Sequence, residues 1–575
     1  MKFAVKSLSL LCVLCGSVLC LSLDREAFSI TNYDLNVQIE PEQHRLGVRG
    51  KITLRNDTPT PQKIAVLQIS SSLDWRAIRA ADKMLQFVTQ PYTSDIDHTG
   101  SLSEAIVTLP QEVAAHGAID LDIAYEGIVL LDATRLTRIG TPEDAAKSSD
   151  WDQIDPNFTG LRGAGYVAWY PIATEMANLS EGDSLFEVLS RWKVRQSGST
   201  MKIQFAVTTD YPSIRQVLLG GLICPASKLE ATSQVNQWQF GECVPQRLRF
   251  DTPVILIGAY EVTEQPGLEI RYLPGHNAAA TSFADSAKVA VPIVSEWFGT
   301  ARERAKIADL PYSDAAPFES GVLLLTPLSS SDPKLAGLSA THQLTHASFF
   351  SFRPWIEEGL AHFAQVLYLE QQQGRQAALD YMGVHRSVLT AIEPASIAPN
   401  ADDISRSLVN TNNEQLYRSK AMCVWWMLRD MVGDAALKKA IASYKPEQDK
   451  APSYMPLLIA AQTQRDLQWF FDDWVYHDHG LPDFKVESAF AAGTPTKSFL
   501  LTITLDNLGT AGAEVPVTMK FAGGEVTKRI EIRAKSKATF RVETPAGPQE
   551  IRVNDGSVPE SDMTNNTFKV GTPQN

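Results

Sequence analysis

The chain has 575 residues, a formal net charge of −14 and an isoelectric point near 5.3. This length exceeds what one hydrophobic core supports and fits about three or four domains of ordinary size. With 44% hydrophobic and 21% charged residues, the composition is that of a folded globular protein. The acidic balance argues against nucleic acid or an anionic membrane surface as a partner.

Residues 1–22 have the pattern of a secretory signal peptide. Lys2 and Lys6 precede an apolar run over residues 8–21, and polar residues follow at 24–26. The run is too short to cross a bilayer, and no later stretch approaches the length of a transmembrane span. We therefore expect an exported protein, periplasmic or extracellular, without a transmembrane span.

Cysteine usage fits an exported chain. Beyond the signal peptide the cysteines are Cys224, Cys243 and Cys423. Cys224 and Cys243 flank a polar loop that a disulfide would close, whereas Cys423 lies in an apolar helical pattern typical of a buried free thiol. We expect one disulfide, between Cys224 and Cys243.

Residues 23–264 have the pattern of an antiparallel β domain. Apolar and polar residues alternate in several runs, which is the period of a half-buried strand. The clearest runs are 33–39, 50–54, 64–69, 119–123, 201–207 and 254–258.

From residue 265 to 485 the apolar period becomes helical, and a histidine pair stands out. His342 and His346 are four residues apart, so on a helix both imidazoles project from one face, as two zinc ligands require. A catalytic zinc takes three protein ligands. Glu358 is the candidate third ligand, because Pro354 marks the start of a second helix that can fold against the first.

These segments resemble the M1 aminopeptidase-like group of gluzincin metallopeptidases, whose signature is His-Glu-x-x-His followed by a Trp-Leu-Asn-Glu-Gly-Phe-Ala-like stretch. The second half here reads Trp355-Ile-Glu-Glu-Gly-Leu-Ala361, so the resemblance places the third zinc ligand on Glu358. The family's general-base Glu, which takes a proton from the zinc-bound water, is Gln343 in this chain. The connection of eleven residues between His346 and Glu358 is shorter than in typical members.

Two further segments extend the resemblance. The run from Leu416 to Ala421 stands where the family has a Tyr-Glu-Lys-Gly-Ala helix, which implies that Tyr417 donates a hydrogen bond to the oxyanion of the transition state. The strand-like run 321–325 stands where the family has Gly-Ala-Met-Glu-Asn, whose Glu holds the free amine of the substrate. That Glu has no match in the run, and Glu319 stands at an unmatched position, so aminopeptidase specificity is not carried over.

The replacement of the family's Glu by Gln343 bears directly on activity. Glutamine is nearly isosteric with glutamate but cannot accept a proton, and general acid–base catalysis contributes roughly 10²–10⁴ in rate. His362 lies four residues beyond Glu358 on the same helix face and is an auxiliary candidate, as a base or an extra ligand. Glu357 points about a third of a turn away from Glu358, as a solvated or supporting residue.

Short alternating strands separated by Gly, Asn and Pro turns return over residues 486–575, a pattern typical of an Ig-like β-sandwich. The sequence therefore predicts a multidomain α+β protein. Its parts are a signal peptide (1–22), an N-terminal β-rich, M1-like domain (23–264), a thermolysin-like, mainly helical metallopeptidase domain (265–485) and an Ig-like β-sandwich (486–575).

Three functions remain open. The leading hypothesis is an exported zinc metallopeptidase that hydrolyses peptide or protein substrates with zinc-activated water, weakened by Gln343. The alternative is a non-catalytic pseudopeptidase that keeps the metal and the groove and binds peptides or proteins. The third is a structural surface protein in which the histidine pair is a relic without metal. Peptide turnover separates the first two, and zinc stoichiometry separates the third; no feature indicates a particular oligomeric state.

Overall fold

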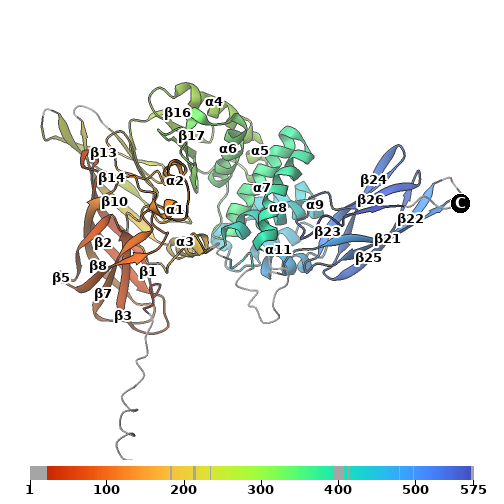
Figure 1. The fold of residues 1–575 in the computed structure, drawn as a ribbon, viewed down its shortest axis with the longest axis horizontal. Coiled ribbons are helices and arrows are strands. Elements are labelled where there is room, and N and C mark those ends of the chain that lie inside the picture. Colours follow the sequence, from red (N-terminus) through yellow and green to blue (C-terminus); the bar gives the residue numbers. More distant parts are fainter. Residues whose placement is uncertain are drawn as a thin grey trace, which may run out of the picture.

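The computed structural model describes residues 23–181, 184–210, 215–233, 235–392, 407–411, 413–477, 479–495 and 498–570. The signal peptide expected at 1–22 lies outside these residues. Along the longest axis the chain forms N-terminal sheets, then a helical middle part, then C-terminal sheets (Figure 1). The predicted multidomain α+β organisation is confirmed at this level. No helix in the described ranges combines the length and the apolar character that crossing a membrane requires.

The N-terminal part consists mostly of strands. Its strands are β1 (Phe28–Glu40), β2 (Arg45–Asn56), β3 (Gln62–Ser70), β4 (Leu73–Ala80), β5 (Lys83–Met84), β6 (Gln86–Thr93), β7 (Ser101–Val113), β8 (Ala118–Ile128), β9 (Thr159–Leu161), β10 (Thr200–Asp210), β11 (Gln216–Leu219), β12 (Leu222–Cys224), β13 (Ala226–Ala231), β14 (Asn236–Arg247) and β15 (Ile255–Gly258). Its helices are α1 (Thr134–Arg138), α2 (Glu143–Ser149) and α3 (Ser184–Gln196).

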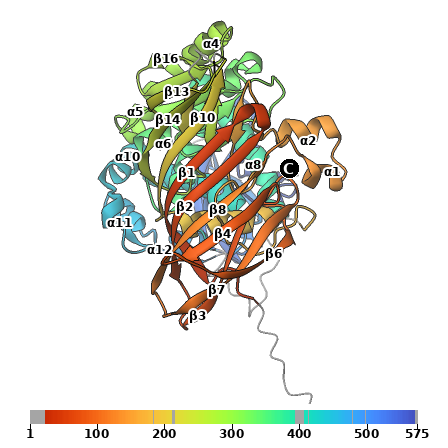
Figure 2. The same cartoon turned by 90° about the vertical axis from the view of Figure 1, so that its left-hand side faces the viewer.

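These strands form three sheets. The largest has the order β13-β14-β10-β1-β2-β8-β4-β5 and lies broadside in Figure 2; the others are β3-β7-β6 and β12-β11-β15-β9. Buried and exposed residues alternate along β1, because one face of the sheet packs on the core and the other faces solvent. The prediction of a purely antiparallel domain is wrong in one place, since β1 pairs with β10 in parallel. A long crossover separates the two strands, which a parallel pair needs.

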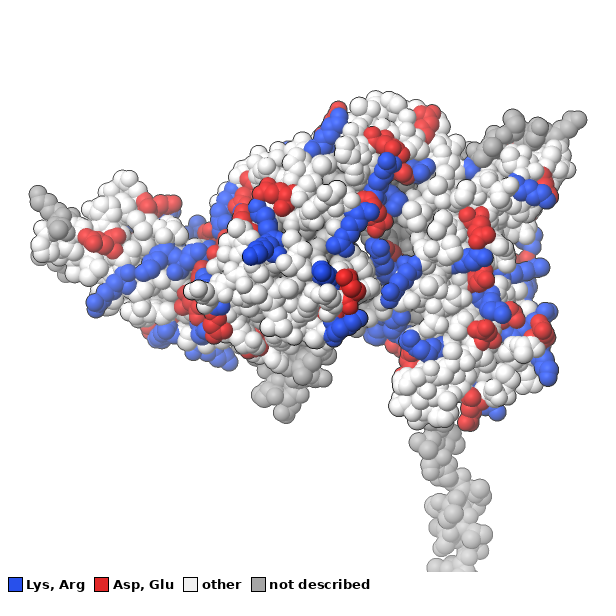
Figure 3. Space-filling model, turned by 180° about the vertical axis from the view of Figure 1, so that it is seen from behind, with Lys and Arg blue, Asp and Glu red and all other residues white. Residues whose placement is uncertain are grey.

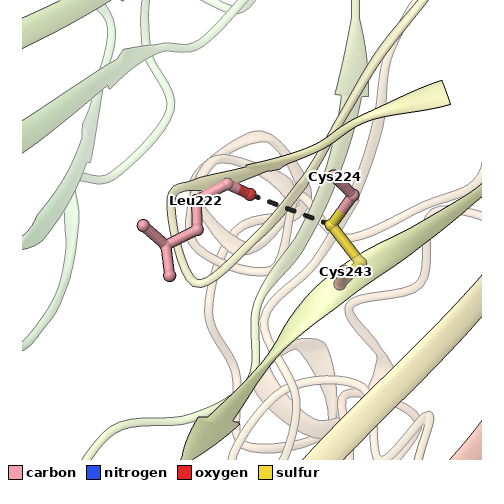
Figure 4. The surroundings of a disulfide bond; sticks show 3 residues. All are labelled: Leu222, Cys224 and Cys243. Carbon is pink, nitrogen blue, oxygen red and sulfur yellow. Dashed lines mark hydrogen bonds between the residues drawn. A yellow bond between two sulfur atoms is a disulfide. The ribbon is translucent and has the colours of Figure 1, made fainter.

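A disulfide joins two of these sheets. Cys224 on β12 and Cys243 on β14 are bonded (Figure 4). Cys423, in the middle part, is a buried free cysteine.

The middle part surrounds one mixed sheet with helices. Its strands are β16 (Glu261–Gln265), β17 (Leu268–Tyr272), β18 (Ala305–Asp309), β19 (Phe318–Ser320) and β20 (Leu323–Thr326). Its helices are α4 (Asn277–Lys288), α5 (Ala290–Phe298), α6 (Pro333–Ser348), α7 (Pro354–Gln373), α8 (Arg375–Ile392), the π-helical turn η3 (Leu416–Lys420), α9 (Ala421–Val432), α10 (Asp434–Ser443), α11 (Tyr454–Ala460), α12 (Gln468–Phe471) and the π-helical turn η5 (Asp472–Tyr476).

The sheet of the middle part has the order β16-β17-β18-β20-β19, and its last strand, β19, runs antiparallel at the edge. The single strand predicted over residues 321–325 is therefore only partly right. Gly321, whose φ is 54°, lies with Val322 in the tight turn between β19 and β20. A left-handed φ of this kind is readily adopted by glycine. After the turn, β20 pairs with β19 on one side and β18 on the other, so β19 is the edge strand.

The C-terminal part has two sheets, β21-β22-β25 and β24-β23-β26-β27. Its buried residues form one apolar cluster with those of the helical middle part. The N-terminal part has a second cluster, and a third joins it to the sheet of the middle part. Figure 3 shows basic and acidic side chains interspersed over one face, with Lys and Arg gathered where the N-terminal and middle parts meet. The strands are β21 (Phe484–Gly493), β22 (Phe499–Asn507), β23 (Ala513–Phe521), β24 (Gly524–Ile532), β25 (Ser536–Thr544), β26 (Pro548–Val553) and β27 (Thr567–Lys569).

Candidate metal centre

Helices α6 and α7 carry the three residues predicted as metal ligands. Helix α6 begins at Pro333, and the side chain of Asp332 caps it by accepting a hydrogen bond of 2.8 Å from the Lys334 backbone N–H. Helix α7 begins at Pro354, where the fixed φ of proline suits the first turn. The five residues 349–353 connect the helices and let them pack side by side.

This packing brings His342, His346 and Glu358 together. The two Nε2 atoms lie 3.1 Å apart. Glu358 Oε2 lies 3.8 Å from His342 Nε2, and Glu358 Oε1 lies 3.7 Å from His346 Nε2. The three side chains each offer one ligand atom, and these atoms all lie within 4.8 Å of one another. Two imidazole nitrogens and a carboxylate oxygen are a donor set that suits zinc.

Glu357 orients His346. Its Oε1 accepts a hydrogen bond of 3.1 Å from His346 Nδ1, and its Oε2 accepts one from the Ser351 backbone N–H. A carboxylate on Nδ1 leaves Nε2 as the nitrogen that faces a metal. Burial opposes a charged ring here, but the hydrogen bond to Glu357 and the charge of Glu358 outweigh it and raise the pKa of His346 to about 9. Glu357 thus supports the ligand group.

Arg418, on η3, lies beside the carboxylate ligand. Its Nε is 3.1 Å from Glu358 Oε2, and its guanidinium also pairs with Glu414 at 2.6 Å. Burial favours a neutral Glu358, but the charges of Arg418 and His346 dominate and hold its pKa well below the usual range. Glu358 is therefore ionised, as a metal ligand must be.

A glycine lets the next helix approach this site. A Cβ atom on Gly359 would lie 2.7 Å from the Ala421 side chain and 2.9 Å from Trp425 Nε1. The rings of Trp355 and Trp425 stack with centroids 5.3 Å apart. The Trp and Gly of the motif Trp355–Ala361 thus have packing roles, and this close contact of α7 with α9 sets Tyr417 and Arg418 near Glu358.

The turn between α6 and α7 is fastened to the N-terminal part. Arg247 lies over the ring of Phe352 at 5.1 Å, and Arg249 lies over that of Phe350 at 4.4 Å. Phe350 and Phe352 contact each other edge to face, with centroids 4.7 Å apart. These cation–π contacts hold the short connection between α6 and α7 against the N-terminal part.

Tyr417 lies buried on η3, and its hydroxyl is 3.3 Å from Ser190 Oγ on α3. Burial raises the pKa of Tyr417 far above its usual range. The hydroxyl therefore keeps its proton and can donate a hydrogen bond. Nothing in the sequence pointed to Ser190, which reaches Tyr417 from the N-terminal part.

Gln343 and His362 are polar residues at the site whose side-chain atoms have no hydrogen-bond partner among the described residues. Gln343 is fully buried on α6, and neither atom of its amide is hydrogen bonded there. An unpaired buried polar group costs about 1–3 kcal/mol, so the position suits a polar ligand or water beside the metal site. The His362 ring lies 4.9 Å from His342 and 5.9 Å from His385. Burial keeps the pKa of His362 well below its usual value, so this ring is neutral.

The edge strand β19 brings another carboxylate to the site. Glu319 Oε2 lies 3.7 Å from His342 Nε2. The run 321–325 has no match for the family's amine-binding Glu, and the structure brings the unmatched Glu319 to the site. The chain turns at Gly321, so residues 318–320 form a separate strand, β19. Glu319 lies on this strand, and its side chain reaches His342 on α6. Burial raises the pKa of Glu319.

The antiparallel edge strand β19 thus lies near helix α6, which carries His342 and His346. Neither a protein-family model nor a curated protein matches the chain. Among solved structures it is similar to Legionella pneumophila aminopeptidase A in complex with aspartic acid, with a TM-score of 0.58 and 14% identity over 93% of this chain and 59% of that chain. It also matches an M1 zinc metallopeptidase from Deinococcus radiodurans, with a TM-score of 0.47 and 16% identity over 76% of this chain and 91% of that chain.

The Legionella protein is an aminopeptidase, and the Deinococcus protein is an M1 zinc metallopeptidase. The likeness to the Legionella protein shows the fold alone, and this chain spans about three fifths of that protein's length, since the match covers 59% of it.

Proposed function

We propose that the chain is an M1-like zinc metallopeptidase that hydrolyses peptide bonds, with its rate lowered by Gln343. His342, His346 and Glu358 would hold the zinc ion, which supplies a Lewis acid and an activated water. The observation that carries this proposal is the convergence of three donor atoms within 4.8 Å. The contacts of Glu357 with His346 and of Arg418 with Glu358 support it, because they fix the ring orientation and the charge that a metal needs.

The chain's own residues can bind and orient a peptide. The free edge of β19 offers backbone groups to an extended substrate by strand addition. Glu319 stands on that edge 3.7 Å from His342 Nε2, so a substrate amine paired with it would lie next to the metal site. Tyr417 would donate its hydroxyl proton in a hydrogen bond to the developing oxyanion. This placement favours cleavage near a free N-terminus.

A pseudopeptidase is the second candidate, and Gln343 is the observation that favours it. Its amide can hydrogen bond to a water molecule but cannot take its proton. Without a general base the reaction loses roughly 10²–10⁴ in rate, which is about 3–5 kcal/mol of barrier. The site would then bind zinc and peptides without turnover.

The test is hydrolysis of a peptide library by the zinc-loaded mature protein, beside a Gln343→Glu variant at equal zinc content. Each peptide is supplied with a free and with an acetylated N-terminus. A peptidase cleaves in its native form, and the free-amine set is preferred if Glu319 binds the amine. Cleavage by the variant alone identifies a pseudopeptidase. No cleavage by either form at full zinc occupancy rejects peptide hydrolysis as the function.

Export and domain limits belong to the same proposal. We propose removal of residues 1–22 as a signal peptide, domains at 23–264, 265–485 and 486–575, and an Ig-like role for the last as a support or binding module. The disulfide between Cys224 and Cys243 is consistent with an oxidising compartment. N-terminal sequencing of the protein recovered from the periplasm or medium tests export, and an uncleaved Met1 in a cytoplasmic fraction contradicts it.

A further inference from the structure

We propose that Asp251, in the segment between β14 and β15, is the proton acceptor for the attacking water, the role that Gln343 cannot fill. This assignment rests on the proposed peptidase function. It makes the N-terminal part a contributor of a catalytic residue.

Asp251 opens into a cleft of about 20 Å³ beside the ligand group, which is the space of roughly one water molecule. Asp251 and Arg249 line it from the N-terminal part, and His346 and Glu358 line it from α6 and α7. The hairpin turn makes room for the carboxylate, because a Cβ atom on Gly321 would lie 2.5 and 2.6 Å from its two oxygens. A side chain at Gly321 would displace Asp251 from this place.

The backbone around Asp251 is held on both sides. Gln196 Nε2 on α3 donates a hydrogen bond of 3.1 Å to the Asp251 carbonyl oxygen. The next residue, Thr252, donates its backbone N–H to Ser320 Oγ on β19 at 3.0 Å. The carboxylate is thus positioned by the same strand that carries Glu319.

Asp251 is the carboxylate at the site that is free to accept a proton. In the described part of the chain no group donates a hydrogen bond to its side chain, whereas Glu357 is bonded to His346 and Ser351. Glu358 is a proposed ligand paired with Arg418, and Glu319 Oε2 lies 3.7 Å from His342 Nε2. His362 is a weaker candidate, because both its nitrogens are buried between His342 and His385.

The charged groups around Asp251 are compatible with this role. Burial raises its pKa, against the charges of His346, Arg249 and Lys193, while Glu358 adds to the rise. A raised pKa makes the carboxylate a stronger base than an ordinary aspartate, which suits a proton acceptor.

The proposed step conserves atoms and charge. As the water oxygen bonds to the scissile carbonyl carbon, one water proton moves to Asp251 Oδ. Asp251 then delivers this proton to the peptide nitrogen while the carbon–nitrogen bond breaks. The products are a carboxylic acid and an amine, and Asp251 is again ionised.

The experiment compares the wild type, Asp251→Asn, Gln343→Glu, the double variant and the control Asp34→Asn, which changes an exposed carboxylate of β1. Peptide hydrolysis is measured at equal zinc content. We expect Asp251→Asn to lower kcat by roughly 10²–10⁴ with zinc content and KM retained. The double variant should recover activity, because it offers a carboxylate at position 343, and the control should match the wild type.

Two further measurements keep the assignment testable if the Asn variant folds poorly. Added formate should restore part of the activity of Asp251→Ala, since it can occupy the cleft. In the cobalt-substituted protein, the pH midpoint of the visible spectrum should move by about one unit in Asp251→Ala relative to Asp34→Asn.

Different results overturn different claims. Activity of Asp251→Asn within threefold of the wild type, or an unmoved cobalt midpoint, rejects Asp251 as the acceptor. Cleavage by Gln343→Glu with none by the wild type rejects this assignment but keeps the metal site. If neither form cleaves at full zinc occupancy, the proposed function fails and the assignment fails with it.

Discussion

Replacing Glu357 by Gln should weaken zinc binding although Glu357 is not a ligand. In the wild type its two oxygens accept one hydrogen bond each, from His346 Nδ1 and from the Ser351 backbone N–H. Glutamine has one acceptor oxygen, so one of these donors must lose its partner. The buried site also loses the negative charge that supports His346.

The magnitude follows from these contacts. Partners that orient a metal-binding histidine are typically worth 10–100-fold in metal affinity, which is about 1.4–2.8 kcal/mol. A lost hydrogen bond to a charged group, about 1.5–3 kcal/mol, lies in the same range. We therefore expect the dissociation constant for zinc to rise by roughly 10–100-fold in Glu357→Gln.

Competition with a chromophoric chelator at fixed pH measures this constant. The matched control is Glu370→Gln on the same helix α7, which removes a carboxylate paired with Arg429 and should leave zinc affinity unchanged. Circular dichroism in excess chelator confirms that both variants are folded. Zinc affinity of a folded Glu357→Gln within twofold of the wild type would refute the orienting role of Glu357.

Three further predictions concern other parts of the chain. Tyr417→Phe removes the hydroxyl that is hydrogen bonded to Ser190. We expect kcat to fall by roughly 10²–10³ at unchanged zinc content, as it does when an oxyanion donor is lost. An unchanged kcat contradicts that role. Replacing Cys224 and Cys243 by Ser opens a disulfide with a sequence separation of 19 and should lower the free energy of unfolding by about 3 kcal/mol, measured by denaturant titration. Burial raises the pKa of Glu560 to about 7 from 4.5, so the folded state holds this proton more tightly than the unfolded chain. Its contribution to stability is full below about pH 4.5 and is lost as the pH rises through 7; Glu560→Gln should therefore show a flatter dependence of Tm on pH than the wild type between pH 5 and 8.

The sequence alone determined the features that depend on neighbouring residues. The spacing of His342 and His346 places both rings on one helix face, and Pro354 begins the next helix. Alternating polarity identified the N-terminal and C-terminal strands. These predictions succeed because helix and strand periods, and the positions that proline favours, are local properties of the backbone.

The tertiary structure decided which distant side chains reach the site. Glu319 reaches the site because the chain turns at Gly321, so that β19 rather than β20 is the edge strand of the sheet. Arg418 reaches Glu358 through the close packing at Gly359. Asp251 and Ser190 belong to the N-terminal part. Their distance from the site depends on how this part packs against the helical middle part, and sequence spacing does not reveal that packing. The chemistry of the proposed site therefore follows from local sequence for its ligands and from domain packing for the groups around them.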